Sequence, residues 1–229
     1  MSKRGRNRES LFVTPTAPGT LLAAPVTSVG FAASILEIGG GRAKETGSAT
    51  VKDRRIALLR GINVGRAKRV AMADLRDLVQ GLGYTDVRTV LNSGNIVFSA
   101  PGEPADRAAH RIEAALPDAV GVSSKVTGLN AETLAMIVAE NPLALAGCSP
   151  SRLMVVFLAK AAERSKQDSL TGHDWTPDEL GVGSRAAYLW CPQGFLVSRL
   201  AEATGRALGP AATTRNWGTV MKLHALACG

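Results

Sequence analysis

The chain has 229 residues, of which 45% are hydrophobic and 20% charged, which is typical of a globular protein that buries a core. Its formal net charge of +8 favours anionic partners, either nucleic acid or phosphorylated ligands, although scattered basic residues are also typical of a solubilising surface. Three widely spaced cysteines without a CxxC pair indicate neither a zinc site nor a disulfide framework, and we expect a cytoplasmic protein without a membrane helix.

Residues 1–53 differ from the remainder of the chain and are predicted to be a disordered or dispensable tail. They contain Thr, Pro, Gly and Ser clusters, and prolines at 15, 18 and 25 interrupt their apolar stretch. A basic start followed by apolar residues resembles a signal peptide, but an unbroken apolar region is missing. We predict that the native protein begins near Val51, because a GTG valine codon can initiate translation in bacteria.

From Arg54 onward the hydrophobic pattern becomes regular. A short apolar run predicts a buried strand, spacings of three and four predict helices, and an Asn-Ser-Gly-Asn turn divides an extended stretch. In chain order the pattern predicts a strand at 56–59, a helix at 72–82, an extended segment at 87–98, a helix at 105–116 that Pro117 stops, a strand at 124–126 and a helix at 131–140.

The second half continues this mixture. It predicts strands at 152–158 and 186–190, a helix at 198–208 and a last helix at 216–227. A doubly wound sheet is one reading of this order. The short spacings and Gly-rich turns favour an α+β fold of two packed subdomains, 54–145 and 146–229, each with split βαβ (ferredoxin-like) character.

The common catalytic signatures are missing. The sequence has no HExxH, GxSxG or GxGxxG, and its three histidines share no ligand spacing. The stretch GINVGRAK after the first strand lacks the GxxxxGK[ST] spacing of a phosphate-binding loop. No catalytic residue, cofactor or metal site is therefore predicted.

Three polar segments nevertheless interrupt or end apolar elements. At the exit of the first strand, an Arg and an Asn among glycines are suited to cradle an anion, and the alternative is a tight strand-to-helix connection. The second segment is an Asn-Ser-Gly-Asn break, which marks either a site or a bulge. The third precedes the last helix, where the alternative is capping by Thr213 and Thr214 with Trp217 buried. The candidate ligand-binding residues are Arg60, Gly61, Asn63, Gly65, Lys68, Asn92, Ser93, Asn95, Arg215 and Asn216.

Together these segments resemble the DUF1697 family of small bacterial proteins, whose function is unassigned. The resemblance lies in ALLRGINVG at 57–65, MADLR at 72–76, NSGNIVF at 92–98 and TTRNWGTVMKL at 213–223. It implies an α+β fold with two subdomains and no known cofactor. Two positions depart from the pattern, with Gly218 where we expect Asn and Ala71 where we expect Pro.

We expect polar groups from the three segments to converge on one surface, because binding groups are usually mounted at the ends of strands and helices. The favoured hypothesis is binding of an anionic small molecule, a nucleotide or nucleic acid. The alternative is an enzyme that acts on a small polar substrate through the same polar groups.

Overall fold

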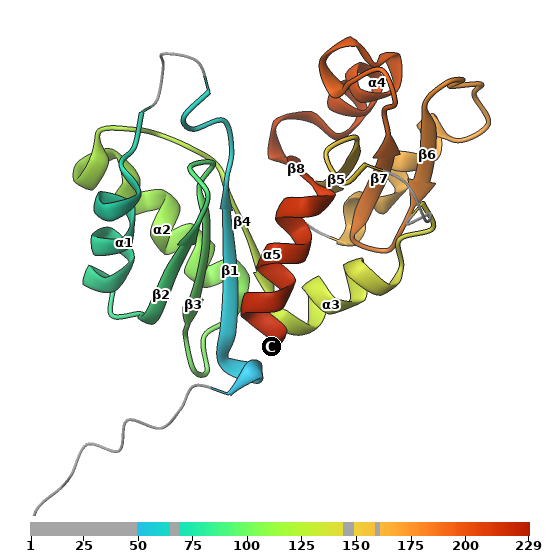
Figure 1. The fold of residues 1–229 in the computed structure, drawn as a ribbon. Helices are drawn as coiled ribbons and strands as arrows, with labels where there is room; N and C mark the ends of the chain where they lie inside the picture. Colours follow the sequence, from blue (N-terminus) through green and yellow to red (C-terminus); the bar gives the residue numbers. More distant parts are fainter. Residues whose placement is uncertain (1–49, 65–68, 144–148, 159–160) are drawn as a thin grey trace, which may run out of the picture. The chain divides into compact units, whose positions relative to one another are not determined.

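The computed structural model describes residues 50–64, 69–143, 149–158 and 161–229, and its first half is a four-stranded antiparallel sheet (Figure 1). After the short 3-10 turn η1 (Val51–Asp53), the sheet order is β2-β3-β1-β4. Helices α1 and α2 cover one face of this sheet (Figure 1). The element bounds are β1 (Arg54–Leu59), α1 (Met72–Gly81), β2 (Thr85–Val90), β3 (Asn95–Ser99), α2 (Ala105–Val120), β4 (Val126–Asn130) and α3 (Ala131–Ala139).

The second half repeats this topology. Its sheet has the order β6-β7-β5-β8, so β5 to β8 occupy the positions that β1 to β4 occupy in the first sheet. Between the first two strands of each half, the 3-10 segment η2 replaces helix α1. The bounds are β5 (Leu153–Phe157), η2 (Ala161–Leu170), β6 (Glu179–Val182), β7 (Ala186–Trp190), η3 (Phe195–Val197), α4 (Arg199–Leu208), η4 (Gly209–Ala211), β8 (Thr213–Asn216) and α5 (Trp217–Cys228). The prediction of an α+β fold of two split βαβ subdomains is confirmed.

Strand registers define which residues of the two repeats are equivalent. Leu58 pairs with Asn95 and Thr127, and Phe157 pairs with Ala186 and Thr213. Asn95 is therefore equivalent to Ala186, and Thr127 to Thr213. By the same registers Leu129 is equivalent to Arg215, which makes a direct comparison of the two repeats possible.

The helix after each fourth strand begins in the same way. The Asn130 side chain accepts a hydrogen bond from the backbone N–H of Thr133 at 2.7 Å, and that of Asn216 accepts one from Thr219 at 2.9 Å. An Asn N-cap satisfies a backbone donor that the first helical turn leaves free. The shared Asn-x-x-Thr pattern thus fixes the starts of α3 and α5.

Three hydrophobic clusters form the core of the described residues. One lies between the first sheet and α1 with α2, and another lies between the second sheet and α4. The third combines the inner faces of both sheets with α3 and α5, so residues as distant as Ile56 and Tyr188 share one cluster. Because residues 46–229 form one compact unit, the repeats are not separate domains joined by a linker. No helix in the described part of the chain is long and apolar enough to cross a membrane.

Several boundaries differ from the sequence prediction. Helix α2 continues through Pro117 to Val120, because buried Leu116 and half-buried Val120 pack on the first core cluster and Gly121, with φ 67°, ends the helix. The strand expected at 124–126 lies at Val126–Asn130. The short strand β6 was not predicted.

The prediction that Thr213 and Thr214 cap the last helix is wrong. Both belong to β8, and the cap is Asn216. The expected tail at 1–53 overlaps the described residues only at 50–53, where residues 51–53 form η1; residues 1–49 lie outside the described part. Its dispensability and the start near Val51 stay predictions, as does the boundary between subdomains at residue 145.

Candidate functional site

Arg215 on β8 is a buried guanidinium that reaches from the second repeat into the first. It is 8% exposed, and its Nε donates to Asn95 Oδ1 at 2.5 Å. Its Nη2 donates to the carbonyl oxygens of Leu59 and Ser93 at 2.6 and 2.9 Å, and its Nη1 donates to the Thr214 carbonyl at 2.8 Å. These bonds use four of the five guanidinium N–H groups, which leaves one on Nη1.

The charge of Arg215 has no acidic counterpart. Within the described part of the chain, no carboxylate oxygen lies within 4.0 Å of its guanidinium. Burial lowers the pKa of Arg215 to about 10, because desolvation disfavours the charged form. Buried charges are usually paired with an opposite charge, so this cation is an exception.

Arg215 lines a cavity of about 550 Å³ between the two repeats. The first repeat contributes residues from the loop after β1 and from the β2–β3 turn, and the second contributes β5, α4, β8 and the start of α5. The polar lining residues are Arg60, Ser93, Thr204, Thr214, Arg215, Asn216 and Thr219. The three polar segments of the sequence therefore supply Arg60, Ser93, Arg215 and Asn216 to one cavity.

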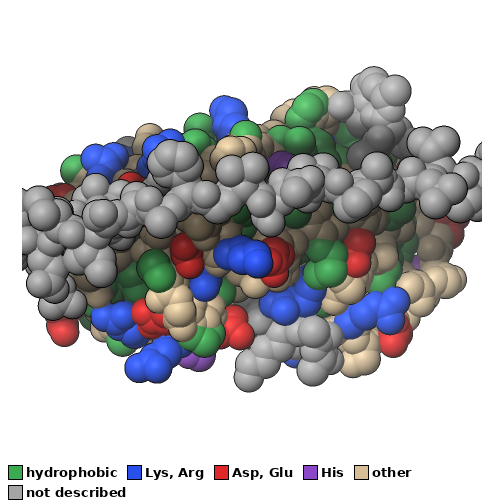
Figure 2. Space-filling model, turned by 90° about the horizontal axis from the view of Figure 1, so that it is seen from below, with side chains coloured by type: hydrophobic (Ala, Val, Ile, Leu, Met, Phe, Trp, Pro, Cys, Tyr) green, Lys and Arg blue, Asp and Glu red, His purple; other side chains and the backbone are tan. Residues whose placement is uncertain are grey.

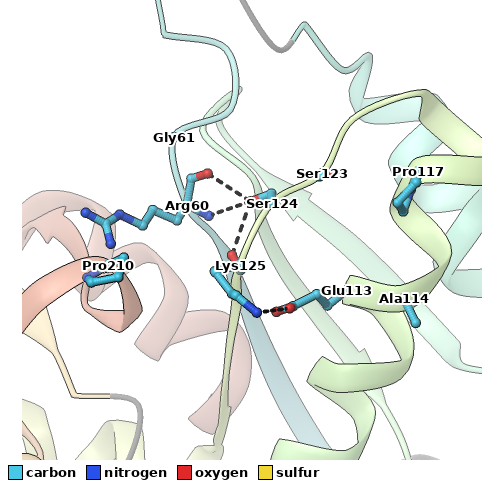
Figure 3. A pocket seen from close by; sticks show the side chains of 9 residues that line it. All are labelled: Arg60, Gly61, Glu113, Ala114, Pro117, Ser123, Ser124, Lys125 and Pro210. Atoms are coloured by element: carbon cyan, nitrogen blue, oxygen red, sulfur yellow. Dashed lines mark hydrogen bonds and ion pairs between the residues drawn. The ribbon is translucent and has the colours of Figure 1, made fainter.

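Arg60 stands at the edge of this cavity on the exit of β1. Its backbone N–H donates to Ser124 Oγ at 3.0 Å, and its carbonyl accepts from the same hydroxyl at 2.8 Å. Figure 3 shows its side chain extending toward Pro210, and Nη1 donates to the Gly209 carbonyl at 3.2 Å. The backbone of Arg60 is thus fixed, while its charge faces the second repeat without an ion-pair partner among the described residues.

A second cavity of about 570 Å³ adjoins the first, and Arg60 and Gly61 line both. Its other charged lining residues, Glu113 and Lys125, pair at 2.5 Å (Figure 3). The bonds that Glu113 accepts from Lys125 and from the Val126 N–H lower the pKa of its carboxyl group against the opposing effect of burial. This pair is internally neutral, so the uncompensated charge lies on the Arg215 side of Arg60.

Asn63 and Asn92 do not line the cavity of Arg215. Both border a separate hollow with Val70 and Met72. The Asn63 amide donates to the carbonyls of Val70 and Asn92 and accepts from the Val70 N–H, so its side chain holds a loop together. For Asn63 and Asn92 the geometry favours the structural alternative, a tight connection.

Asn95 lies behind the cavity wall, fully buried. Its Nδ2 donates to the Val90 carbonyl and to Ser93 Oγ, while its Oδ1 accepts from Arg215. It positions Arg215 and does not itself face the cavity. Gly65 and Lys68 lie outside the described residues.

Sequence analysis did not single out the apolar part of the lining. Met154, Val156, Phe195 and Ala201 come from β5, η3 and α4 of the second repeat. In sequence they are indistinguishable from core residues, because a strand or helix pattern does not reveal which buried side chains border a cavity. The available signal for these lining residues was the equivalence of the two repeats, which the sequence shows only as the shared Asn-x-x-Thr pattern.

The lining also limits the chemistry. Among the described residues of this cavity there is no Asp, Glu, His or Cys, and in the described part of the chain no cluster of these residues is suited to a metal ion. Figure 2 shows basic and acidic side chains interspersed on the face it presents, rather than a basic patch. Uncompensated positive charge is therefore a property of the cavity and not of that surface.

Comparison with known proteins agrees with this fold. No curated protein matches the chain. A solved structure, that of the conserved bacterial protein SP0830 from Streptococcus pneumoniae, is similar with a TM-score of 0.63 and 20% identity, over 76% of this chain and 98% of that one. Residues 53–188 match the family described as "Protein of unknown function (DUF1697)", so the matched segment ends in β7 and precedes Arg215. Because this match spans more than half of the sequence, the chain belongs to the DUF1697 family.

Proposed function

We propose that the cavity between the two repeats binds a small anionic ligand. The observation that carries the proposal is Arg215, a buried guanidinium with four N–H groups held by neutral acceptors and one N–H left over, and no carboxylate of the described residues lies within 4.0 Å of it. An anion in the cavity would supply the missing counter-charge in a place where water screens it weakly. Arg60 would contribute a second positive charge from the rim.

The ligand is proposed to be small, because the cavity of about 550 Å³ has the size of small-molecule sites. Binding of nucleic acid needs phosphate contacts along an extended basic surface, and it weakens steeply with salt. No described lining residue is suited to act as a general base, so no observation favours an enzyme over a binding protein. A cytoplasmic location stays a prediction.

The test is calorimetric titration of the full chain with inorganic phosphate, sulfate, phenyl phosphate and a short RNA. We expect at least one small anion to bind with one-to-one stoichiometry and to raise the melting temperature, since a ligand of the native state stabilises it. Arg60→Ala should weaken that binding, whereas Arg206→Ala, on α4 outside the cavity lining, should not. Binding of RNA alone, with a steep salt dependence, would overturn the proposal.

The pH dependence supplies a second test. The pKa of Arg215 is lowered to about 10, so the guanidinium stays charged below that pH and loses its proton as the pH rises through it. A bound anion favours the charged form and raises this pKa, hence binding takes up protons near pH 10. Affinity for sulfate, which does not titrate there, should be constant from pH 6 to 9 and fall above pH 10. Affinity that is unchanged at pH 11 would contradict the lowered pKa of Arg215.

A further inference from the structure

The walls of the proposed anion site differ in polarity, and this difference limits the class of ligand that fits. Its charged groups, Arg60 and Arg215, lie near the exits of β1 and β8. The second repeat adds an apolar wall, because Val156 and Ala201 belong to the hydrophobic cluster under α4, and half-buried Met154 and Phe195 pack against the same cluster. From the first repeat, Ile62 and Val64 add further apolar surface.

An inorganic ion would leave most of this wall in contact with water. A cavity of about 550 Å³ is far larger than a phosphate or sulfate ion needs. Covering apolar surface contributes roughly 25 cal/mol per Å², so a ligand with an apolar body would gain affinity that a bare ion does not. Pockets with mostly apolar walls and a few placed polar groups are typical of sites for organic ligands.

The charged groups of the lining favour an anion over a cationic ligand. Among its described residues no carboxylate is present to hold an amine or the paired hydroxyls of a sugar. The hydroxyl of Thr204 is already committed to the Leu200 carbonyl, and that of Thr219 to the Asn216 side chain. Ser93, Thr214 and Asn216 add hydroxyl and amide groups, so the described lining combines positive charge and apolar surface with neutral polar groups.

We infer that the ligand is an amphipathic anion, with one compact phosphate or carboxylate head group on an apolar body of about aromatic-ring size. The inference rests on the proposed function, since it assigns the head group to the two arginines. The body lies against the wall of Met154, Val156 and Phe195.

A substitution at Gly205 can exclude the apolar body of the ligand without changing Arg60 or Arg215. It lines the cavity, lies within α4, and a Cβ added there meets no atom within 4 Å. Gly205→Leu should place a branched side chain in the space that the apolar body requires. It should also favour the helix, in which glycine is disfavoured relative to other residues. Gly205→Ala is the matched control, because it adds helix propensity and only one methyl group.

The experiment titrates the full chain and both variants with 1-naphthyl phosphate, 1-naphthoate and inorganic phosphate. We expect the naphthyl anions to bind the unchanged protein at least tenfold more tightly than inorganic phosphate. Gly205→Leu should remove this advantage while inorganic phosphate binds as before, and Gly205→Ala should retain most of it. The naphthoate and naphthyl phosphate titrations distinguish a carboxylate from a phosphate head group.

Three outcomes would overturn the inference, and they separate it from the proposed function. If inorganic phosphate and the naphthyl anions bind equally, the site takes anions without an apolar preference, and only the further inference fails. If Gly205→Leu leaves the naphthyl advantage intact, the body lies elsewhere, and again only the further inference fails. If no probe binds, both proposals fail.

Discussion

The interface between the two repeats has a polar half and an apolar half at equivalent positions. On one half Arg215 meets Asn95, with a bond of 2.5 Å from Nε to Oδ1. On the other half the equivalent residues are Leu129 and Ala186, which belong to a single buried hydrophobic cluster. The same backbone arrangement therefore accommodates either a buried cation or a hydrophobic pair.

The apolar half shows that the fold itself does not require the charge. A buried cation without a counter-ion is costly, and replacing buried charged groups with well-packed hydrophobic residues is often neutral or stabilising. The cavity lies beside the polar half, with Arg215 and Ser93 in its lining. This difference supports the proposed ligand, because the packing of the repeats does not by itself require a cation at position 215.

The largest expected effect comes from replacing Arg215 with leucine, the residue at the equivalent position 129 of the apolar half. Arg215→Leu should lower the free energy of unfolding by about 3–5 kcal/mol, because it changes only one side of the cluster and leaves three buried acceptors, Asn95 Oδ1 and the Leu59 and Ser93 carbonyls, without their donor. Adding Asn95→Ala should recover little of this loss, since it removes the orphaned amide oxygen but also takes the amide donor from the Val90 carbonyl. Urea unfolding measures both.

Leu129→Ala on the apolar half is the control for this pair. It should cost about 2–5 kcal/mol through the cavity it leaves, and Asn95→Ala should not rescue it. Neither the Arg215→Leu single variant nor the double variant should gain stability from the anion that stabilises the unchanged protein. Equal urea midpoints for Arg215→Leu and the unchanged protein would contradict the stabilising role given to the polar cluster.

A smaller effect is expected at the turn that presents Ser93 to Arg215. Gly94 has a φ of 71°, and an added Cβ would lie 2.6 Å from Ile62 Cδ1 and 2.8 Å from Leu59 Cβ. Gly61 has a similar φ of 64°, but a Cβ there meets nothing within 4 Å. Gly61→Ala should cost only the left-handed backbone strain, about 1–2 kcal/mol, and Gly94→Ala about 1–3 kcal/mol more.

Thermal or urea unfolding of the two glycine variants measures this difference. Arg185 is the equivalent of Gly94 in the second repeat. The Leu59 N–H donates to the Gly94 carbonyl, and the equivalent Leu158 N–H donates to the Arg185 carbonyl. Because Arg185 carries a side chain, the second repeat has room for a Cβ at the position where the first repeat has none. Equal losses in Gly61→Ala and Gly94→Ala would show that the turn relaxes without cost.

At the rim of the cavity we expect an effect on binding and almost none on stability. Arg60→Lys should lower affinity for the bound anion about tenfold, roughly 1.4 kcal/mol, because an ammonium group cannot reproduce a two-pronged guanidinium contact. The melting temperature should change little, since Arg60 makes a single side-chain bond to the Gly209 carbonyl. Calorimetry with Arg206→Lys as the control tests this, and undiminished affinity would reduce Arg60 to a surface charge.

The smallest effect is expected where the two halves meet. Thr127 and Thr213 are equivalent residues whose hydroxyls lie 3.0 Å apart, both buried. Thr127→Val and Thr213→Val should each cost about 0.5–1.5 kcal/mol, and the double variant should cost less than their sum. A double-mutant cycle in urea measures the coupling. Strict additivity would mean that the two hydroxyls do not act as a pair.

The sequence by itself determined the elements that rest on local patterns. The strands at β1, β5 and β7 and helices α1, α3, α4 and α5 were predicted, because periodic burial and turn residues are local properties. The two-subdomain α+β fold followed from their order. The sequence also identified Arg60, Ser93, Arg215 and Asn216 as a group, since polar residues at the ends of apolar runs break the local rule.

Only the tertiary structure decided what each polar residue does. Thr213 and Thr214 resemble caps locally, but they are strand residues because β5 offers them an edge to pair with. Asn63 and Arg215 both follow or end a strand, yet one closes a loop and the other crosses between repeats. Local sequence does not encode which distant carbonyls a side chain will meet. Packing of the two repeats alone therefore made Arg215 a buried cation beside a cavity, with no ion-pair partner among the residues that the structure describes.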